Sequence, residues 1–289
     1  MAAIMSVGTG ARMTVRPYEP RDLVRVLELV EGDRLPGRPA VTAEVFGHVL
    51  ADCHPAGAAP SLLQEPRTDV VVDRGGEVVG AAGWVLRAQG GEVLLLWLHC
   101  MEDDQQVAQV LVRHVLEQAG RRTVRAFGEP TAMSFAGLPV RNRRGTAVAL
   151  EAAGFSREDG WRYLHCRLDE LRRPPYEVVD ITESPDPYGW YMRLREKDGT
   201  HIGKAVVSRP VEGTAFLEWI SLTLEEDRPG HFLLRQCLAH LADRGIRELV
   251  VLPDTLTDPS GDSRDLVGEL HRQAGFQELD QLHPYTRRP

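Results

Sequence analysis

The sequence has little lysine, little cysteine and no long apolar run, and each shortage narrows the interpretation. Lys197 and Lys204 are the only lysines among 34 basic residues, which indicates base-composition bias rather than a function. The four cysteines form no CxxC pair, so no zinc knuckle is spelled out and we expect buried free thiols. No apolar run approaches the roughly 18 residues that a membrane-spanning helix needs, and the first residues lack the pattern of a signal peptide. We therefore expect a cytoplasmic protein.

Positive charge is also in deficit, with 34 Lys and Arg residues against 42 Asp and Glu residues and a formal net charge of −8. Since phosphate backbones and anionic lipids are bound by basic surfaces, neither nucleic acid nor a membrane is an expected partner. The basic cluster Arg141-Asn-Arg-Arg is interpreted as a solvated loop. The sequence contains no Walker loop, no GxSxG elbow, no HExxH and no paired metal-ligand spacing, so we expect no metal site.

The chain of 289 residues, 43% of them hydrophobic, is longer than one hydrophobic core usually supports. Its first half alternates between the period of strands and the period of helices. The predicted elements are a strand at 13–18, helices from 20 to 35 and from 42, a hairpin of 68–72 and 78–86, a buried strand at 93–99, a helix at 103–120, a strand at 123–127, a helix at 145–153 and a strand at 163–168.

The second half repeats the later part of this pattern. Its predicted elements are a hairpin of 188–195 and 201–208, a buried strand at 216–222, a helix at 230–245, a strand at 248–252, a helix at 264–274 and a last strand at 281–285. Ala153-Gly-Phe and Ala274-Gly-Phe follow corresponding helices, which indicates an internal duplication whose second copy lacks the two leading helices. Because Pro174-Pro175 interrupts both helices and central strands, we expect domains at 1–172 and 173–289.

Several stretches, together with this repeated order, carry a family resemblance. They are His231-Phe-Leu-Leu-Arg-Gln-Cys-Leu-Ala-His-Leu-Ala-Asp-Arg-Gly, Ser263 to Phe276, Leu282 to Arg288, Gly137-Leu-Pro-Val and Trp161-Arg-Tyr-Leu. The chain resembles tandem proteins of the GNAT superfamily of acyl-CoA-dependent N-acyltransferases, of actinobacterial type. The resemblance implies an α+β fold with two GNAT-like domains, each a mixed, mostly antiparallel, splayed sheet flanked by helices. The buried strand and the next strand would form the only adjacent parallel pair, opening a wedge for the pantetheine arm.

The resemblance also implies that the acyl-CoA pyrophosphate binds where the helix after the buried strand begins, in a loop of pattern R/Q-x-x-G-x-G/A. Free backbone N–H groups and the positive helix end explain this preference. The first copy, Asp103 to Ala108, keeps only the final Ala, and the second, Glu225 to Gly230, keeps only the final Gly. A carboxylate about 5 Å from a phosphate costs on the order of 3 kcal/mol at an effective dielectric near 20, more than a helix cap contributes, unless it points to solvent.

Arg228 supplies positive charge in the second copy only, so that copy is the candidate active one and the first is expected to be non-catalytic. By the resemblance, main-chain groups at Ile220 and Leu222 would hold the acyl-CoA arm. Arg228, Gly230 and His231 would hold its pyrophosphate. The implied cosubstrate is acetyl-CoA or another acyl-CoA.

Two residues are candidates for proton transfer. The family tyrosine that protonates the leaving thiolate falls on Leu150 in the first copy and on His271 in the second; histidine, with an unperturbed pKa of ~6.5, can serve. The alternative is a surface histidine on an amphipathic helix. Glu218, amid Phe-Leu-Glu-Trp-Ile, is the candidate general base, because a carboxylate in an apolar strand is costly unless it lines a cleft or has a partner. An outward-facing position at a half-exposed strand end is the alternative.

Three functional hypotheses follow. The first is a GNAT-type N-acetyl or N-acyltransferase that moves an acyl group from acyl-CoA to a small amine, with Glu218 as base and His271 as acid. The second is a non-catalytic GNAT-like protein that binds a small molecule or a partner through eroded loops. The third keeps catalysis without CoA. A homodimer is left open.

Overall fold

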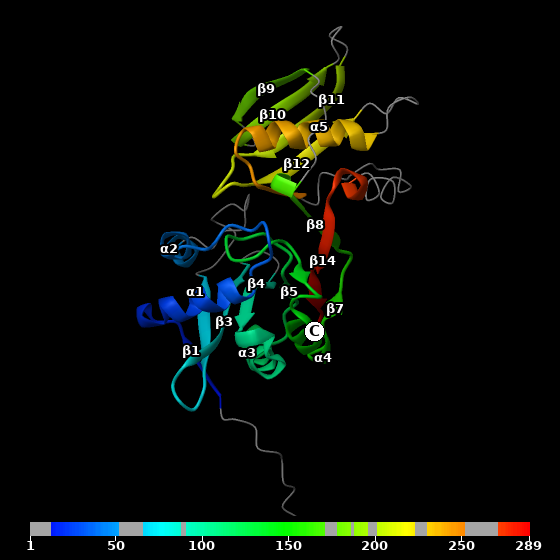
Figure 1. Cartoon of the computed structure of the whole chain (residues 1–289). Coiled ribbons are helices and arrows are strands. Elements are labelled where there is room, and N and C mark those ends of the chain that lie inside the picture. The colour runs from blue at the N-terminus through cyan, green and yellow to red at the C-terminus, as the bar shows by residue number, and fades with distance from the viewer. Residues whose placement is uncertain are drawn as a thin grey trace, which may run out of the picture. The chain divides into compact units, whose positions relative to one another are not determined.

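The computed structural model describes residues 13–51, 66–87, 91–170, 178–185, 188–195, 201–222, 230–251 and 271–289. The chain forms two compact units (Figure 1). Unit 1 comprises Met1–Arg34, Ala40–Gly160 and Leu282–Pro289, and unit 2 comprises Leu35–Pro39 and Trp161–Gln281.

Unit 1 follows the predicted order of elements. They are β1 (Thr14–Pro17), the short 3-10 helix η1 (Pro20–Asp22), α1 (Leu23–Gly32), α2 (Ala43–Ala51), β2 (Arg67–Val72), β3 (Val78–Leu86), β4 (Val93–Cys100), the 3-10 turn η3 (Met101–Asp103), α3 (Gln105–Ala119), β5 (Val124–Ala126), β6 (Leu138–Pro139), α4 (Arg144–Ala152) and β7 (Ser156–Arg157). The sheet of this unit has the order β1-β2-β3-β4-β5-β15-β7 among the described strands, with β15 (Tyr285–Arg287) supplied by the end of the chain.

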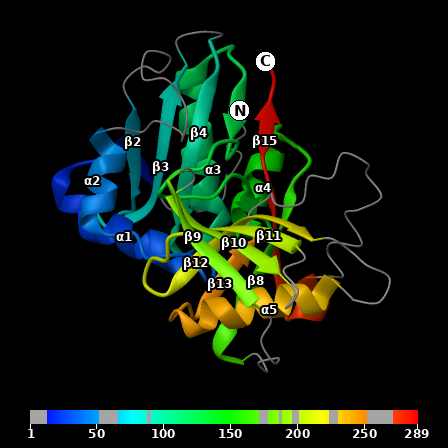
Figure 2. The same cartoon turned by 90° about the horizontal axis from the view of Figure 1, so that it is seen from above.

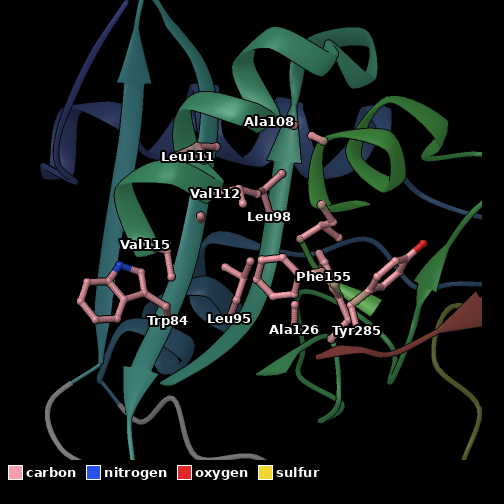
Figure 3. Packing of buried hydrophobic residues seen from close by; sticks show 14 of the residues in the cluster. Trp84, Leu95, Leu98, Ala108, Leu111, Val112, Val115, Ala126, Phe155 and Tyr285 are labelled. Atoms are coloured by element: carbon pink, nitrogen blue, oxygen red, sulfur yellow. The ribbon is translucent and has the colours of Figure 1, made fainter. Parts of the chain in front are cut away.

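Two helical layers cover the two faces of this sheet. Apolar residues of α1 and α2 pack with Leu94, Leu96 and Trp97 of β4. Val107 and Leu111 of α3, together with α4, pack on the opposite face (Figure 3). Since successive strand residues point to opposite faces, an apolar strand such as β4 is what a sheet covered on both sides requires.

Unit 2 has fewer helices than unit 1 among the residues that the structure describes. Its elements are β8 (Trp161–Arg167), the 3-10 turn η4 (Leu168–Glu170), β9 (Val178–Pro185), β10 (Tyr188–Arg195), β11 (His201–Ser208), β12 (Thr214–Leu222), α5 (Gly230–Asp243), β13 (Glu248–Val251) and β14 (Gln277–His283). The described strands follow the order β14-β8-β13-β12-β11-β10-β9, and the final residues of β14, which belong to unit 1, pair with β6. Helix α5 packs on one face of this sheet (Figure 2).

Each sheet is mixed in the predicted way. In unit 1, β4 pairs in parallel with β5, and in unit 2, β12 pairs in parallel with β13. The other strand pairings described within each unit are antiparallel. The prediction of an α+β fold with two mixed, splayed sheets flanked by helices is therefore confirmed.

The compact units do not follow the expected division between residues 172 and 173. Strand β8, expected to close the first copy, pairs antiparallel with β13 in unit 2. The end of the chain, expected as a single strand of the second copy, instead forms β14 and β15, and β15 pairs antiparallel with β5 and β7 of unit 1. Periodicity predicts that a segment is a strand but not which sheet it joins. Pro174-Pro175 lies outside the described residues.

Local differences also have physical reasons. The helix predicted from residue 103 begins at Gln105, because Glu102 and Asp103 adopt left-handed backbone conformations (φ 51° and 52°) that no helix continues. Strands β6, β7 and β9 were not predicted. The helix predicted at 264–274 lies largely outside the described residues, of which 271–274 are helical. No described helix is long and apolar enough to cross a membrane.

Candidate functional site

Both sheets carry a β-bulge at the same position of their buried strand. In unit 1, Gly83 pairs with Trp97 and the next residue of β3 pairs with Leu95, so Leu96 is the extra residue. In unit 2, the same shift between β11 and β12 leaves Glu218 as the extra residue, directly before Trp219. A bulge bends its strand and re-aims a side chain, and it is common next to active sites.

The bulge marks where the parallel pair opens. The last described pair between β4 and β5 is Leu95 with Ala126, and the last between β12 and β13 is Leu217 with Val251. In unit 1, β4 continues to Cys100 while β5 ends at Ala126. The opening that the resemblance assigns to the pantetheine arm therefore starts at the bulge in unit 1.

In unit 1, the loop after β5 forms hydrogen bonds with the polar groups beside this opening. Ser134, on the loop after β5, donates from Oγ to the main-chain oxygen of Leu96 over 2.9 Å. Met133 on the same loop is fully buried, and its carbonyl lies 3.2 Å from Nε2 of His99. The loop is thus fixed against β4 at the bulge.

The start of α3, where a pyrophosphate would bind, is capped by its own acidic residue. The Asp104 carboxylate accepts hydrogen bonds from the main-chain N–H groups of Gln106 (2.7 Å) and Val107 (3.3 Å). These are among the donors that a phosphate at a helix start would use. Asp104 therefore does not simply point to solvent but occupies the site with a negative charge.

The preceding residue, Asp103, caps a second helix. Its carboxylate accepts from the main-chain N–H of Gly145, from the main-chain N–H of Thr146 at 3.0 Å and from the Thr146 hydroxyl at 2.6 Å. A Cβ on Gly145 would meet the Asp103 main-chain oxygen, so glycine permits this close approach. The acidic pair thus ties the start of α3 to the start of α4.

Arg143 corrects the interpretation of 141–144 as a solvated loop, because it is only 2% exposed. Its Nη1 lies 3.1 Å from Oδ2 of Asp33, and its Nη2 donates to the Leu98 oxygen over 2.8 Å. His99, also buried, holds the same Asp33 oxygen from Nδ1 at 2.8 Å. Buried charges require such partners, but a basic run in sequence gives no signal that one member is buried.

Glu218 is half-buried on the face of its sheet opposite α5. Leu217 before it belongs to the core under α5, whereas Trp219 pairs with Val206, whose side chain points to the other face. In unit 1 the equivalent Leu96 and the tryptophan after it both pack on the face opposite α3. Burial raises the pKa of the Glu218 carboxyl. A carboxyl with a raised pKa in a bulge is a reasonable proton acceptor.

The other predicted residues are only partly described. Ile220 and Leu222 lie on β12 after the bulge, in register with Ala205 and Gly203 of β11. Helix α5 begins at Gly230, as predicted, with His231 in its first turn. Arg228 lies outside the described residues.

His271 does not lie on the surface, so the alternative of a surface histidine is wrong. Its side chain is fully buried and its ring packs edge-on against Phe276, with centroids 5.2 Å apart. Phe276 belongs to the core under α5, so His271 and Glu218 do not share a face of the sheet. Leu150, at the corresponding place in unit 1, is fully buried in the core.

Cys100, Cys166 and Cys237 are free and buried, as predicted, and burial raises the pKa of Cys237 to about 12. Cys53 lies outside the described residues. Within the described ranges, no three His, Cys, Asp or Glu side chains gather as a metal site would require.

Comparison with known proteins defines the class of fold. No protein-family model matches the chain, and no curated protein matches it. A tandem GNAT protein from the clavulanic acid biosynthesis pathway superposes with a TM-score of 0.56 at 16% identity, covering 96% of this chain and 98% of that one. A GCN5-related N-acetyltransferase from Sphaerobacter thermophilus gives 0.54 at 14% identity, covering 96% of each chain.

A third solved structure, a glucosamine N-acetyltransferase region of a fungal multi-domain GH3 β-N-acetylglucosaminidase, gives 0.53 at 13% identity, covering 96% of this chain and 38% of that one. The two units together thus have a tandem GNAT fold. At these identities the comparison defines the fold, and function depends on the site.

Proposed function

We propose that this protein is a GNAT-type N-acyltransferase that moves an acyl group from acetyl-CoA or another acyl-CoA to a small amine, with the chemistry in unit 2. The observation that carries the proposal is the difference at the bulge. Unit 1 has the apolar, 1% exposed Leu96 there, whereas unit 2 has the half-buried Glu218. Only the second can accept a proton from an attacking amine.

Unit 1 serves as a structural partner in this proposal. Two kinds of groups that an acyl-CoA would need are occupied: the α3 N–H groups by Asp104 and the bulge oxygen by Ser134. A phosphate bound at the start of α3 would also lie close to the Asp104 carboxylate. The repulsion between these two negative charges costs more than the helix cap contributes. Unit 1 therefore does not fit an acyl-CoA.

Each candidate site residue of unit 2 has a separate role in this proposal. The thioester, when bound, supplies an acyl carbonyl open to nucleophilic attack. Glu218 removes a proton from the amine, directly or through water, which its raised pKa favours. The start of α5 at Gly230 and His231, with Arg228, holds the pyrophosphate, and the main chain of Ile220 and Leu222 holds the arm. In this proposal the thioester lies between the two faces of the opened sheet, so that Glu218 meets the amine from one face and His271, buried beside Phe276, donates a proton to the thiolate from the other.

Calorimetric titration of the intact chain with acetyl-CoA and with CoA tests the proposal, followed by thiol release in the presence of a panel of small amines. We expect saturable binding and amine-dependent release. Asp104→Ala is the matched control, because it changes only the site in unit 1 and should leave affinity unchanged. Absence of acyl-CoA binding to the unmodified chain would overturn the proposal in favour of a non-catalytic binding protein, and amine turnover without CoA would favour the third hypothesis.

A further inference from the structure

The two sheets differ in charge one step away from the bulge. In unit 1, Gly83 pairs with Trp97, and two residues farther along β3, Ala81 pairs with Val70 of β2. The equivalent step in unit 2 starts from the pair of Val206 with Trp219 and leads to Lys204 on β11, which pairs with Arg193 of β10. An apolar cross-strand pair in one copy is thus a pair of cations in the other.

Helices α1 and α2 cover this face of the sheet in unit 1, whereas the described residues of unit 2 include no such cover. Val70 and Ala81 are fully buried beneath α1 and α2. Arg193 and Lys204 are both exposed. No counterpart of α1 or α2 occurs among the described residues of unit 2, whose sheet is entered directly from β8 and β9. The unit 2 face therefore keeps polar side chains where unit 1 has a core.

Two like charges directly opposite each other on neighbouring strands are unfavourable, since their Cβ atoms lie about 5 Å apart. Neither Arg193 nor Lys204 forms an ion pair with another described residue. The Arg193 guanidinium instead lies 5.2 Å from the ring centroid of Tyr191, an arrangement that orients it. On β9, Asp180 is in register with Arg193, and on β12, Ser221 is in register with Lys204, so this row of four residues contains two basic residues and one acidic residue. An anionic ligand would relieve the repulsion.

The distance from this pair to the bulge is set by strand geometry. Lys204 precedes Val206, the partner of Trp219, by two residues, which is about 7 Å along a strand. Both side chains point to the face opposite α5, the face that also carries Glu218. Glu218 lies three residues before Ser221, the partner of Lys204, which is about 10 Å along the strand, and Arg193 lies one strand farther. One surface therefore holds a carboxyl proton acceptor and, a few residues along the neighbouring strands, two cations.

We propose that Arg193 and Lys204 bind an anionic group of the acceptor, so that the substrate is a small amine carrying a carboxylate or a phosphate-like group separated from its nitrogen by several carbon atoms. This rests on the proposed function for the role of Glu218 opposite the amine, but the anion site itself does not. Arg supplies a planar fork of donors and Lys a compact charge, which together suit a tetrahedral or a planar anion.

Two probes that differ only in charge test the anion site by a binding measurement, which does not depend on whether the protein turns them over. 5-Aminopentanoate carries an amine and a carboxylate at opposite ends of a short methylene chain, and 5-aminopentanamide replaces the carboxylate by a neutral amide. We expect the intact chain to bind the carboxylate at least ~10-fold more tightly, measured by NMR titration or calorimetry, and this preference to vanish in the Lys204→Ala, Arg193→Ala double variant. 3-Aminopropylphosphonate separates a phosphate-like preference from a carboxylate one.

The controls keep this inference separate from the proposed function. Arg74→Ala removes an exposed cation from a turn of unit 1 and should leave the preference intact. Lys204→Met keeps the length of the side chain, so its thermal unfolding should match the parent while the preference falls. Equal affinity for carboxylate and amide, or a preference that survives the double variant, would overturn the anion site. Failure of every amine to release thiol from acetyl-CoA would instead count against the proposed function alone.

Discussion

Leu96 and Glu218 are structurally equivalent, each being the extra residue of a β-bulge one position before a tryptophan. The fold has therefore kept the bend of the strand in both copies while the side chain it presents has diverged. Leu96 is 1% exposed and its main-chain oxygen is bonded to Ser134. Glu218 is half-buried, and burial raises its pKa. The bulge is therefore present in both units, whereas only unit 2 has a side chain at the bulge that can accept a proton.

Glu218→Gln should lower turnover by about 10²-fold or more, the usual scale of a lost general base. In the unmodified chain the rate should fall as the pH drops through the raised pKa of Glu218, and the variant should lack this limb. Steady-state rates across pH with acetyl-CoA and an accepted amine are the measurement. Glu212→Gln, an exposed glutamate of the same unit, is the matched control, and a rate like that of the control would remove Glu218 from the mechanism.

The same substitution has an opposite consequence for stability. A carboxyl whose folded pKa is raised contributes stability below its unfolded pKa and loses that contribution as the pH rises through the folded value. At neutral pH, Glu218→Gln should therefore leave the free energy of unfolding unchanged or slightly higher. Urea titrations at acid and neutral pH measure this, and a large loss at neutral pH would indicate that Glu218 has a structural partner.

Asp104→Ala should destabilise unit 1 by about 1 kcal/mol, because the first-turn N–H groups of Gln106 and Val107 lose their cap. Urea unfolding compared with Asp159→Ala, an exposed aspartate of the same unit, measures the difference. Acyl-CoA affinity should stay constant. Tighter acyl-CoA binding in the alanine variant would show instead that unit 1 holds a latent phosphate site.

The fold was predictable because local periodicity gives the order of helices and strands, and because this order, repeated in the two halves of the sequence, resembles that of a known family. Features made by residues far apart in the chain were not. Arg143 belongs to a run that sequence alone interprets as solvated, yet its burial depends on Asp33, 110 positions away. The acidic Asp103 and Asp104 could be recognised as unfavourable to a phosphate, but their cap partners, including Thr146, appear only in three dimensions. Likewise, the pattern around Tyr285 predicts a strand without indicating its sheet.

Tyr285→Ala should cost about 3–5 kcal/mol, the scale for removing a fully buried aromatic ring. The ring lies in the core of unit 1 beside Phe155 (Figure 3), although the residue is close to the end of the chain. Tyr285→Phe is the conservative control, since it keeps the buried ring and the hydroxyl's hydrogen bond to Glu151 is long, at 3.4 Å. Urea unfolding distinguishes them, and equal stability of the two variants would show that β15 does not complete this sheet.

Arg228→Glu should weaken CoA binding by at least ~1 kcal/mol without changing stability, because a charge-assisted phosphate contact would become a repulsion. Calorimetry with CoA measures the effect. Arg121→Glu, a charge reversal at an exposed position of unit 1, is the control for the change in net charge. Equal affinities for the two variants would remove Arg228 from the pyrophosphate site.

His271 offers the most direct test of the proposed acid. If it protonates the thiolate, turnover requires its protonated form, so the rate should fall as the pH rises through the pKa of His271. His271→Phe suits the buried ring site beside Phe276 sterically, and it should abolish this limb and lower turnover by about 10²-fold. His271→Tyr should restore activity and move the limb towards the ~10 of a phenol. A phenylalanine variant with unchanged rate and pH profile would assign His271 to core packing alone.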